Sequence, residues 1–225
     1  YLGLDPFYKL PWGFECYRPG NMPVEYPLVI GFEDMRIWSS GSILWGSSTV
    51  RQLAADGQCE QVMTSLTPHR ENGNDVALRH GEPHRMLREP RETEKNWAPI
   101  IRPGPQEFMW RPGTVVGFDG AFTYKSDPGV HTDNMSGSSQ VIPFKNGYLA
   151  ILHTAHHIPG THLRHYYHRF VQYDAEFNVK RLSRPFYFDD KGIEFCAGMC
   201  FHPAKDELVI SYGWRDCEAR IATVK

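Results

Sequence analysis

The run Tyr148-Leu149-Ala150-Ile151-Leu152-His153 is apolar along its length and ends in a polar residue, which is typical of a buried strand. An aromatic-rich run follows it over residues 166–174, and a third run ends at Ser183-Arg184-Pro185-Phe186. Two further runs, residues 194–201 and 207–212, are separated by a turn that contains proline. Up-and-down strands in groups of about four predict the blades of a β-propeller.

Short β-type runs also fill the chain before this unit, and helical periodicity is nearly absent. Residues 43–50 and 59–66 are two such runs, and the pair Asp56-Gly57 between them is a hairpin signal. The other expected strands lie at residues 97–101, 106–110, 114–118, 140–143 and 219–224. This pattern predicts an all-β sandwich or propeller, and no linker divides residues 1–225 into two domains.

Residues 67–93 differ from the strands on either side. Charged side chains gather in Arg79-His80-Gly81-Glu82-Pro83-His84-Arg85-Met86-Leu87-Arg88-Glu89, and apolar periodicity is weak there. We expect a long excursion between strands, with room for one short helix. Loops of this length are uncommon unless they are functional or mobile.

The composition is that of an ordinary globular protein that is rich in aromatic residues. The chain is 41% hydrophobic and 22% charged, and its formal net charge is -2, so charge does not favour nucleic acid or an anionic membrane as a partner. Aromatic residues make up 13% of the chain. They suit strands, and they also suit clefts that bind the flat apolar faces of sugars.

Targeting and redox features predict a cytoplasmic protein. No apolar run is long enough to span a bilayer, and the first residues, Tyr1-Leu2-Gly3-Leu4-Asp5, lack the basic and apolar regions of a signal peptide. Because the chain does not start with Met, we expect a fragment or a processed product. The five cysteines follow no disulfide-scaffold spacing, so we expect free thiols.

An acidic pair and an arginine open the strand expected at Gly31-Phe32-Glu33-Asp34-Met35-Arg36-Ile37-Trp38. Strand interiors are poor in Asp and Glu, and buried charges are tolerated only when they are paired or hydrogen-bonded. Two interpretations are open. The residues form either a buried polar cluster that serves the function of the protein, or a structural Asp34–Arg36 ion pair on a solvated edge strand.

Several motifs follow one another in the order known from one family. Residues 31–37 resemble the Glu-Asp-Pro-Arg strand of glycoside hydrolase family 130, the β-mannoside phosphorylases and their relatives, with Met35 in place of proline. Residues 94–99 resemble its Asp-Arg-Asn segment, and residues 136–143 with 147–153 resemble its Gly-rich turn and the strand after it. The remaining matches are Arg184-Pro185, Glu194, Gly198 and the closing Tyr212-Gly213-Trp214-Arg215-Asp216.

The resemblance implies an all-β, five-bladed propeller in which the first blade is missing or abbreviated. Residues 1–30 match nothing that we can place in the family. An incomplete propeller exposes strand edges. Candidate partners besides the substrate are a second copy of the chain and a fused glycosyltransferase.

The resemblance also implies that Asp34 is the proton donor. The family's aspartate at this position reaches the glycosidic oxygen through a substrate hydroxyl and acts with inversion. Arg36 would keep Asp34 ionised or orient it by a charge-assisted hydrogen bond. Such an acid is what a departing sugar oxygen requires. A purely structural Asp34–Arg36 pair is the alternative.

The family binds phosphate with two arginines, a lysine, a histidine and a tyrosine. The resemblance implies Lys95, Arg111 and His153 for this role, together with Tyr166 or Tyr167, of which we adopt Tyr167. Lys95 replaces an arginine, so a point charge stands in place of a planar fork, and the family's lysine position holds an asparagine. Attack by water, or transfer without free phosphate, is therefore open beside phosphorolysis.

The sugar is expected to contact six residues near these positions. Glu194 and Asp216 match family positions that face the sugar, where carboxylates accept hydrogen bonds from hydroxyl groups, and Tyr212 or Trp214 can cover an apolar face. Structural alternatives are a turn capped by Asp216 and a strand entrance at Glu194. The full set of predicted substrate-binding residues is Glu33, Arg36, Asn96, Glu194, Tyr212 and Asp216.

Rival sites receive less support. Six histidines between His153 and His168 invite a metal interpretation, but no HExxH motif or Cys pair accompanies them. His165 and His168 are expected on opposite faces of one strand, so we predict a polar rim and no metal or other cofactor. Residues 136–139 lack the Gly-x-Ser-x-Gly pattern of a nucleophile elbow.

Together these features predict an enzyme that cleaves or transfers a glycosidic bond, β-mannosidic by the resemblance, with inversion. Its substrate is an oligosaccharide or glycoside, and the nucleophile is phosphate or water. The alternative is a propeller without catalysis that binds glycans or supports a glycosyltransferase.

Overall fold

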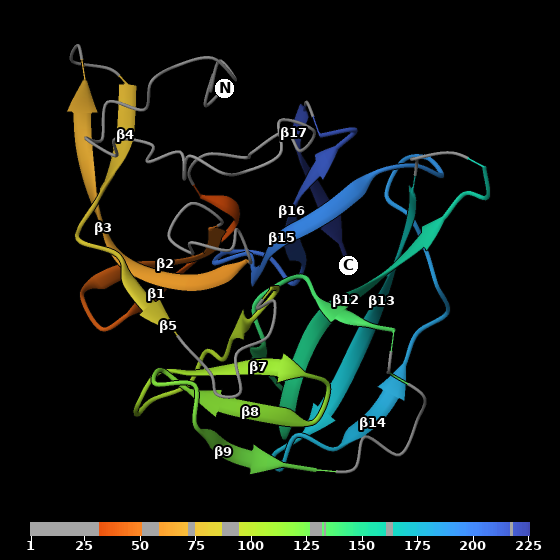
Figure 1. Cartoon of the computed structure of the whole chain (residues 1–225), viewed down its shortest axis with the longest axis horizontal. Coiled ribbons are helices and arrows are strands. Elements are labelled where there is room, and N and C mark those ends of the chain that lie inside the picture. The colour runs from red at the N-terminus through yellow and green to blue at the C-terminus, as the bar shows by residue number, and fades with distance from the viewer. Residues whose placement is uncertain are drawn as a thin grey trace, which may run out of the picture.

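A computed structural model describes residues 32–50, 59–71, 75–86, 95–126, 132, 134–160, 164–216 and 218–225. These residues form strands and turns and include no helix (Figure 1). Accordingly, this part of the chain contains no helix long and apolar enough to cross a membrane. Its strands form four antiparallel sheets, which confirms the predicted all-β class.

The first sheet contains the strand that opens with Glu33 and Asp34. It consists of β1 (Glu33–Ser40), β2 (Ile43–Val50), β3 (Glu60–Glu71) and β4 (Asp75–His80), with β5 (His84–Met86) paired to β3. Strands β2 and β3 pair across the predicted hairpin, with Val50 opposite Glu60.

The excursion predicted for residues 67–93 is wrong in the part that the structure describes. Strand β3 continues to Glu71, and β4 and β5 follow it. The exposed side chains of this extension are mostly polar, so the apolar alternation that signals a half-buried strand is missing. A usable signal was the pair Asn72-Gly73, which lies between β3 and β4 in the sequence and favours a hairpin.

The other three sheets follow in chain order. The second consists of β6 (Ala98–Pro99), β7 (Glu107–Arg111), β8 (Thr114–Gly117) and β9 (Phe122–Lys125). The third consists of β10 (Ser136–Gly137), β11 (Ile142–Phe144), β12 (Gly147–His157), β13 (Arg164–Asp174) and β14 (Val179–Leu182). The fourth consists of β15 (Glu194–Phe201), β16 (Leu208–Trp214) and β17 (Glu218–Val224).

The sheets are arranged like the blades of a propeller (Figure 1). The first strand of each sheet lies toward the middle, where β1 contacts β6 and β15, and β10 contacts β7. The described residues thus form four blades in a propeller-like arrangement. The fifth blade stays a prediction.

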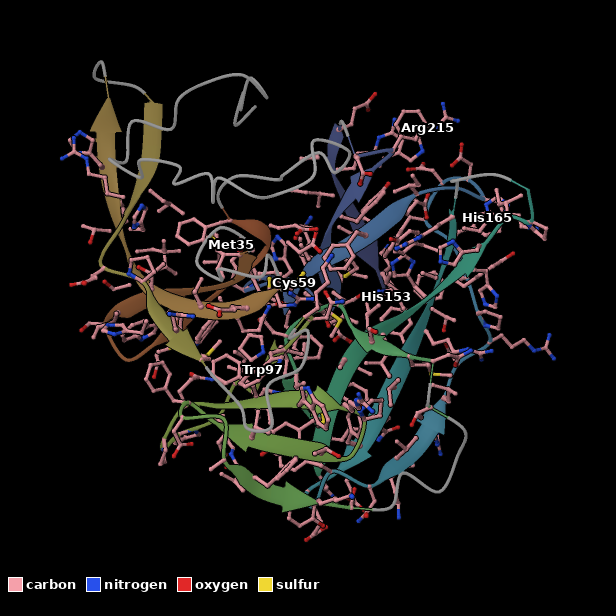
Figure 2. The ribbon with its side chains drawn as sticks, viewed as in Figure 1. Met35, Cys59, Trp97, His153, His165 and Arg215 are labelled. Carbon is pink, nitrogen blue, oxygen red and sulfur yellow. The ribbon has the colours of Figure 1, made fainter. Side chains whose placement is uncertain are left out.

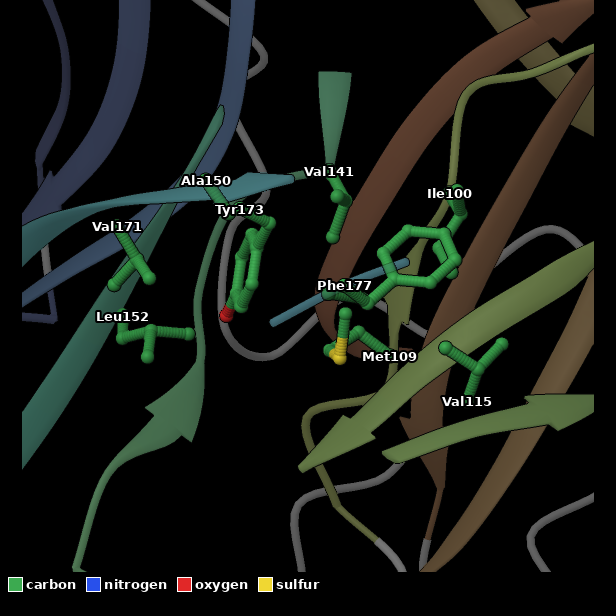
Figure 3. Packing of buried hydrophobic residues seen from close by; sticks show 10 residues of the cluster. Ile100, Met109, Val115, Val141, Ala150, Leu152, Val171, Tyr173 and Phe177 are labelled. Carbon is green, nitrogen blue, oxygen red and sulfur yellow. The ribbon is translucent and has the colours of Figure 1, made fainter. Parts of the chain in front are cut away.

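Each pair of successive sheets encloses its own apolar cluster. One cluster joins the first and second sheets and includes Trp38, Trp97 and Phe108. A second joins the second and third sheets through Val115 and Tyr173, and its packing is drawn in Figure 3. A third joins the third and fourth sheets. Sheets that pack face to face in succession are what a propeller requires.

Strand β12 shows why the run at residues 148–153 is apolar. Ala150 and Leu152 pack in the cluster toward the second sheet, and Leu149 and Ile151 pack in the cluster toward the fourth. Neighbouring strand residues point to opposite faces, so a strand between two blades is apolar at successive positions. Burying each Leu or Ile stabilises the fold by roughly 1.5–3 kcal/mol, and these faces therefore hold the blades together.

Candidate functional site

The start of β1 is irregular, and this irregularity places Asp34. Glu33 pairs with Thr49 and Arg36 pairs with Ser47, so β1 has one residue more than β2 between the two pairs. Such a bulge bends the strand and redirects side chains. Asp34 adopts a φ of 56°, a left-handed conformation that costs energy in a residue other than glycine and persists only where its surroundings hold it.

Arg36 holds this bulge from within the protein. Its side chain is fully buried, and Nη1 donates to the backbone oxygen of Asp34 at 3.0 Å. Nε donates to the backbone oxygen of Ser138 at 2.6 Å, and Nη2 donates to that of Gly137 at 3.0 Å. Nη2 also donates to Oδ1 of Asn96 at 3.3 Å. One guanidinium group thus joins the inner ends of three sheets.

The expected bond from Arg36 to the Asp34 carboxyl group is absent from the hydrogen bonds described for Arg36, since these go to backbone oxygens and an amide. A guanidinium group has five N–H donors, and in Arg36 three of its described hydrogen bonds go to backbone oxygens, which take the place of the expected carboxylate. Burial lowers the pKa of Arg36 to about 10, so the group stays protonated at neutral pH. Its charge still acts on Asp34 through space.

The segment before β6 brings two predicted residues to the same place. Nζ of Lys95 lies 2.9 Å from Oε1 of Glu33, and the two form a partly buried ion pair. Asn96 has a φ of 64°. A Cβ at Gly137 would come within 2.4 Å of the Asn96 backbone oxygen, so only glycine allows the second and third sheets to approach this closely.

The carboxyl group of Asp34 is partly buried, and burial is the main reason why its pKa lies above the usual range. The positive charges of Arg36 and Lys95 lower this pKa, and the negative charges of Glu33 and Asp216 raise it. The result is a carboxyl group that keeps its proton to a higher pH than an exposed aspartate does. A raised pKa of this kind suits a general acid.

Asp34→Asn is expected to raise the melting temperature at neutral pH. Because the pKa of Asp34 is raised, the folded protein binds this proton more tightly than the unfolded chain, in which the pKa is about 3.9. The stabilisation is complete below the unfolded pKa and is lost as the pH rises through the folded pKa. Asparagine avoids that loss, and each kcal/mol regained adds roughly 2–4 °C in a protein of this size.

Calorimetry of both proteins at about pH 4 and about pH 7 measures this effect, with the larger difference expected at the higher pH. Equal differences at the two pH values contradict a raised pKa for Asp34.

His153, on β12, lies beside this cluster. Its Nδ1 is 2.8 Å from Oγ of Ser138, and its ring lies 5.3 Å from Phe195 and 5.6 Å from Tyr166. Burial, followed by the charges of neighbouring groups, lowers the pKa of His153 to about 3. The imidazole is therefore neutral at physiological pH and adds no positive charge to an anion site.

Sequence reasoning missed two members of this cluster. The backbone of Ser138 accepts a hydrogen bond from Arg36 while its hydroxyl contacts His153. The ring of Phe195 lies 5.4 Å from the guanidinium carbon of Arg36 and against His153. The Gly-rich turn at residues 136–139 could have drawn attention to Ser138, but no local pattern singles out Phe195.

The two tyrosines that the sequence left open point to opposite faces of β13. The ring of Tyr166 lies 5.6 Å from that of His153. The ring of Tyr167 lies 5.4 Å from His156 and 6.0 Å from Nζ of Lys191. The structure therefore places Tyr166 next to His153, and the phosphate role of Tyr167 stays a prediction.

The histidines of β12 and β13 divide between the two faces in the same way. His153 pairs with His168 and His156 pairs with His165, so the expected opposite-face placement of His165 and His168 is confirmed. In the view of Figure 2, His153 lies toward the middle of the molecule and His165 toward its edge. Within the described ranges, no group of three or more His, Cys, Asp or Glu side chains is placed to hold a metal ion.

Glu194 begins β15, and its carboxylate binds backbone groups. The residue is fully buried. It accepts hydrogen bonds from the backbone N–H groups of Phe188, Asp189 and Asp190 at 2.6, 2.8 and 3.0 Å. Glu194 thus anchors the loop at residues 188–190, and its predicted contact with sugar stays a prediction.

The aromatic side chains of β16 have partners within the protein. The hydroxyl of Tyr212 donates to Oδ2 of Asp189 at 2.5 Å, and its ring stacks on Phe188 with centres 4.3 Å apart. Two arginine guanidinium groups lie 4.0 and 3.9 Å from the ring centre of Trp214. Tyr212 as a substrate contact stays a prediction.

Two predicted residues lie next to hairpin connections. Asp216 follows β16, is exposed and has a φ of 53°. Arg111 ends β7, is exposed, and its guanidinium carbon lies 4.2 Å from the ring centre of Trp110. The residues that contacts or charge interactions link around Asp34 are Glu33, Arg36, Lys95, Asn96, His153 and Asp216.

No family model and no curated protein matches this sequence. Among solved structures, the chain is similar to that of a glycosyl hydrolase from Bacteroides ovatus, with a TM-score of 0.54 and 13% sequence identity. The alignment covers 85% of this chain and 64% of that one, so this chain spans about two thirds of the length of its structural neighbour. The likeness is one of fold, and it agrees with the propeller-like arrangement.

Proposed function

We propose that this chain belongs to a carbohydrate-active enzyme that cleaves a glycosidic bond with inversion, with Asp34 as the general acid. The observation that carries the proposal is the conformation and environment of Asp34. Its backbone is left-handed, and its partly buried carboxyl group has a raised pKa at the inner ends of the sheets. The sugar is a β-mannoside by the resemblance in sequence. The structural neighbour, described as a glycosyl hydrolase, supports the same class of substrate.

The chemistry explains why such a carboxyl group is useful. The leaving sugar oxygen is a poor leaving group until it receives a proton, so the acid must be protonated at the working pH. Burial and the carboxylates Glu33 and Asp216 favour that protonated state in Asp34. We assign Arg36 to support of the site, because its four described hydrogen bonds all go to groups of the protein.

We assign water as the nucleophile. The ammonium of Lys95 is paired with Glu33, the guanidinium of Arg36 is surrounded by acceptors, and the imidazole of His153 is neutral. A phosphate dianion therefore meets little uncompensated positive charge beside Asp34.

Inversion by water also requires a basic carboxylate on the other side of the sugar. Glu33 and Asp216 are the two carboxylates whose charge acts on Asp34. The negative charge of Glu33 is compensated by its ion pair with Lys95, whereas Asp216 is exposed to solvent. We therefore assign the activation of water to Asp216, in addition to its predicted contact with sugar.

Turnover of β-manno-oligosaccharides is expected to proceed equally in buffers with and without phosphate. Chromatography of the products should show mannose and no sugar 1-phosphate in either buffer, because water attacks in both. Proton NMR of the first product should show the α-anomer, as inversion of a β-linkage requires.

Sugar 1-phosphate that forms only with phosphate would overturn the assignment of water while leaving Asp34 as the acid. Glycan binding without turnover in both buffers would favour the alternative function, that of a non-catalytic propeller that binds glycans.

A further inference from the structure

We propose that Glu194 is a positioning residue: by holding the backbone of residues 188–190, it fixes the β16–β17 hairpin and with it Asp216. This inference rests on the proposed function for its catalytic consequence. Its structural part is independent of that function.

The first step is the buried carboxylate. Glu194 is fully buried, and its two oxygens accept three backbone N–H groups. A buried carboxylate is tolerated only with such partners. Because N–H groups of three consecutive residues point at one side chain, the loop at residues 188–190 has its conformation set by Glu194.

The second step leads from this loop to the hairpin. Oδ2 of Asp190 accepts a hydrogen bond from Nη2 of Arg215 at 2.6 Å, and its Oδ1 accepts one from Nε1 of Trp214 at 3.3 Å. Oδ2 of Asp189 binds Tyr212 and Nη1 of Arg220 at 2.5 and 2.8 Å. The side chains of Asp189 and Asp190 thus form hydrogen bonds with residues of β16, β17 and the hairpin between them, near the end of β16 that Asp216 follows.

The third step is strain in the hairpin. Arg215 and Asp216 each have a φ of 53°, and neither is a glycine. Left-handed residues of this kind persist only where neighbouring groups hold them. The bond to Asp190 and the bond from the Arg215 backbone N–H to the Ile193 oxygen at 2.7 Å supply that hold. Asp190 donates its backbone N–H to Glu194, and Ile193 directly precedes Glu194 in the sequence.

The last step is the effect on the acid. The charge of Asp216 acts on Asp34, and Phe195, next to Glu194, lies against Arg36 and His153. Release of the hairpin therefore moves the Asp216 carboxylate relative to the acid, although Glu194 itself does not touch the sugar. A direct sugar contact by Glu194 makes a different prediction, since its loss weakens binding.

Glu194→Gln in the full chain separates the two roles. The amide keeps the size of the side chain but loses an acceptor and the charge. Hydrogen exchange followed by NMR should show amides of residues 188–190 exchanging about tenfold faster or more. The amide of Arg215 should also exchange faster. Glu176→Gln, at an exposed turn of the third sheet, is the matched control and should change neither.

Kinetics supply the second measurement. We expect kcat to fall about tenfold and KM to change by less than kcat does, since displacement of Asp216 affects the activation of water and the acid more than the binding of the sugar. The limb where activity falls with rising pH should move to lower pH, because Asp216 no longer raises the pKa of Asp34.

Faster exchange confined to residues 188–190, with Arg215 unchanged, overturns the proposal. A raised KM combined with an unchanged fall of activity at high pH also overturns it, because that result identifies a direct contact between Glu194 and the sugar. If the wild-type chain turns over no glycoside, the proposed function fails while hydrogen exchange still decides the link to the hairpin. If Glu194→Gln does not fold, Asp190→Asn is used. It should speed exchange at Arg215 and leave residues 188–190 protected, and an unchanged Arg215 amide again overturns the proposal.

Discussion

Asp34→Asn should lower kcat on an unactivated β-mannoside by about 10²–10⁴-fold, the range typical for loss of a general acid. The amide has the shape of the carboxyl group but no acidic proton, so the sugar oxygen must depart as an alkoxide. KM should change little, because the amide still offers hydrogen bonds in the ground state. Steady-state kinetics of the full chain on β-manno-oligosaccharides measures both constants.

An aryl mannoside with a good leaving group separates proton donation from positioning. Its phenolate departs without a proton, so Asp34→Asn should slow this substrate by less than about tenfold. Asp206→Asn, at an exposed position between β15 and β16, is the matched control and should behave like the wild type. Equal losses on the two substrates would contradict proton donation, and an unimpaired variant would remove Asp34 from catalysis.

The strands that the sequence predicted best are those buried on both faces. Strand β12 was visible as an apolar run because it lies between two blades, and β13 was visible through its aromatic residues. Strands β4 and β5 were missed, because a polar, exposed hairpin carries no apolar period. Local patterns report burial, so strands with little burial are seen only through their turn residues.

The sequence predicted several residues that lie together around Asp34, but not the hydrogen bonds between them. The motif order pointed to Asp34, Arg36, Lys95 and His153, which the structure links through hydrogen bonds or charge. The partners of Arg36 on the third sheet lie about 100 residues away in sequence, so no local pattern reveals them. Strand period alone shows that Tyr166 and Tyr167 face opposite ways, but only the register tells which one meets His153.

Arg36→Met should lower the free energy of unfolding by about 3–5 kcal/mol, because several buried oxygen atoms lose their hydrogen-bond donor at once. Methionine fills a similar volume but donates no hydrogen bond. The backbone oxygens of Gly137 and Ser138 and Oδ1 of Asn96 then lose a buried donor, and each such loss costs about 1–3 kcal/mol. Urea unfolding followed by fluorescence measures the change as a lower midpoint at an unchanged slope.

Two further variants define what the guanidinium fork contributes. Arg36→Lys keeps a positive charge, yet a single ammonium cannot reach acceptors in three sheets at once, so we expect an intermediate loss. Arg181→Met, at an exposed position of β14, should stay within about 0.5 kcal/mol of the wild type. A loss below about 1 kcal/mol for Arg36→Met would mean that water replaces the guanidinium donors. The apolar clusters between the blades would then suffice to hold the inner ends in place, and Asp34 would keep its left-handed bulge without Arg36.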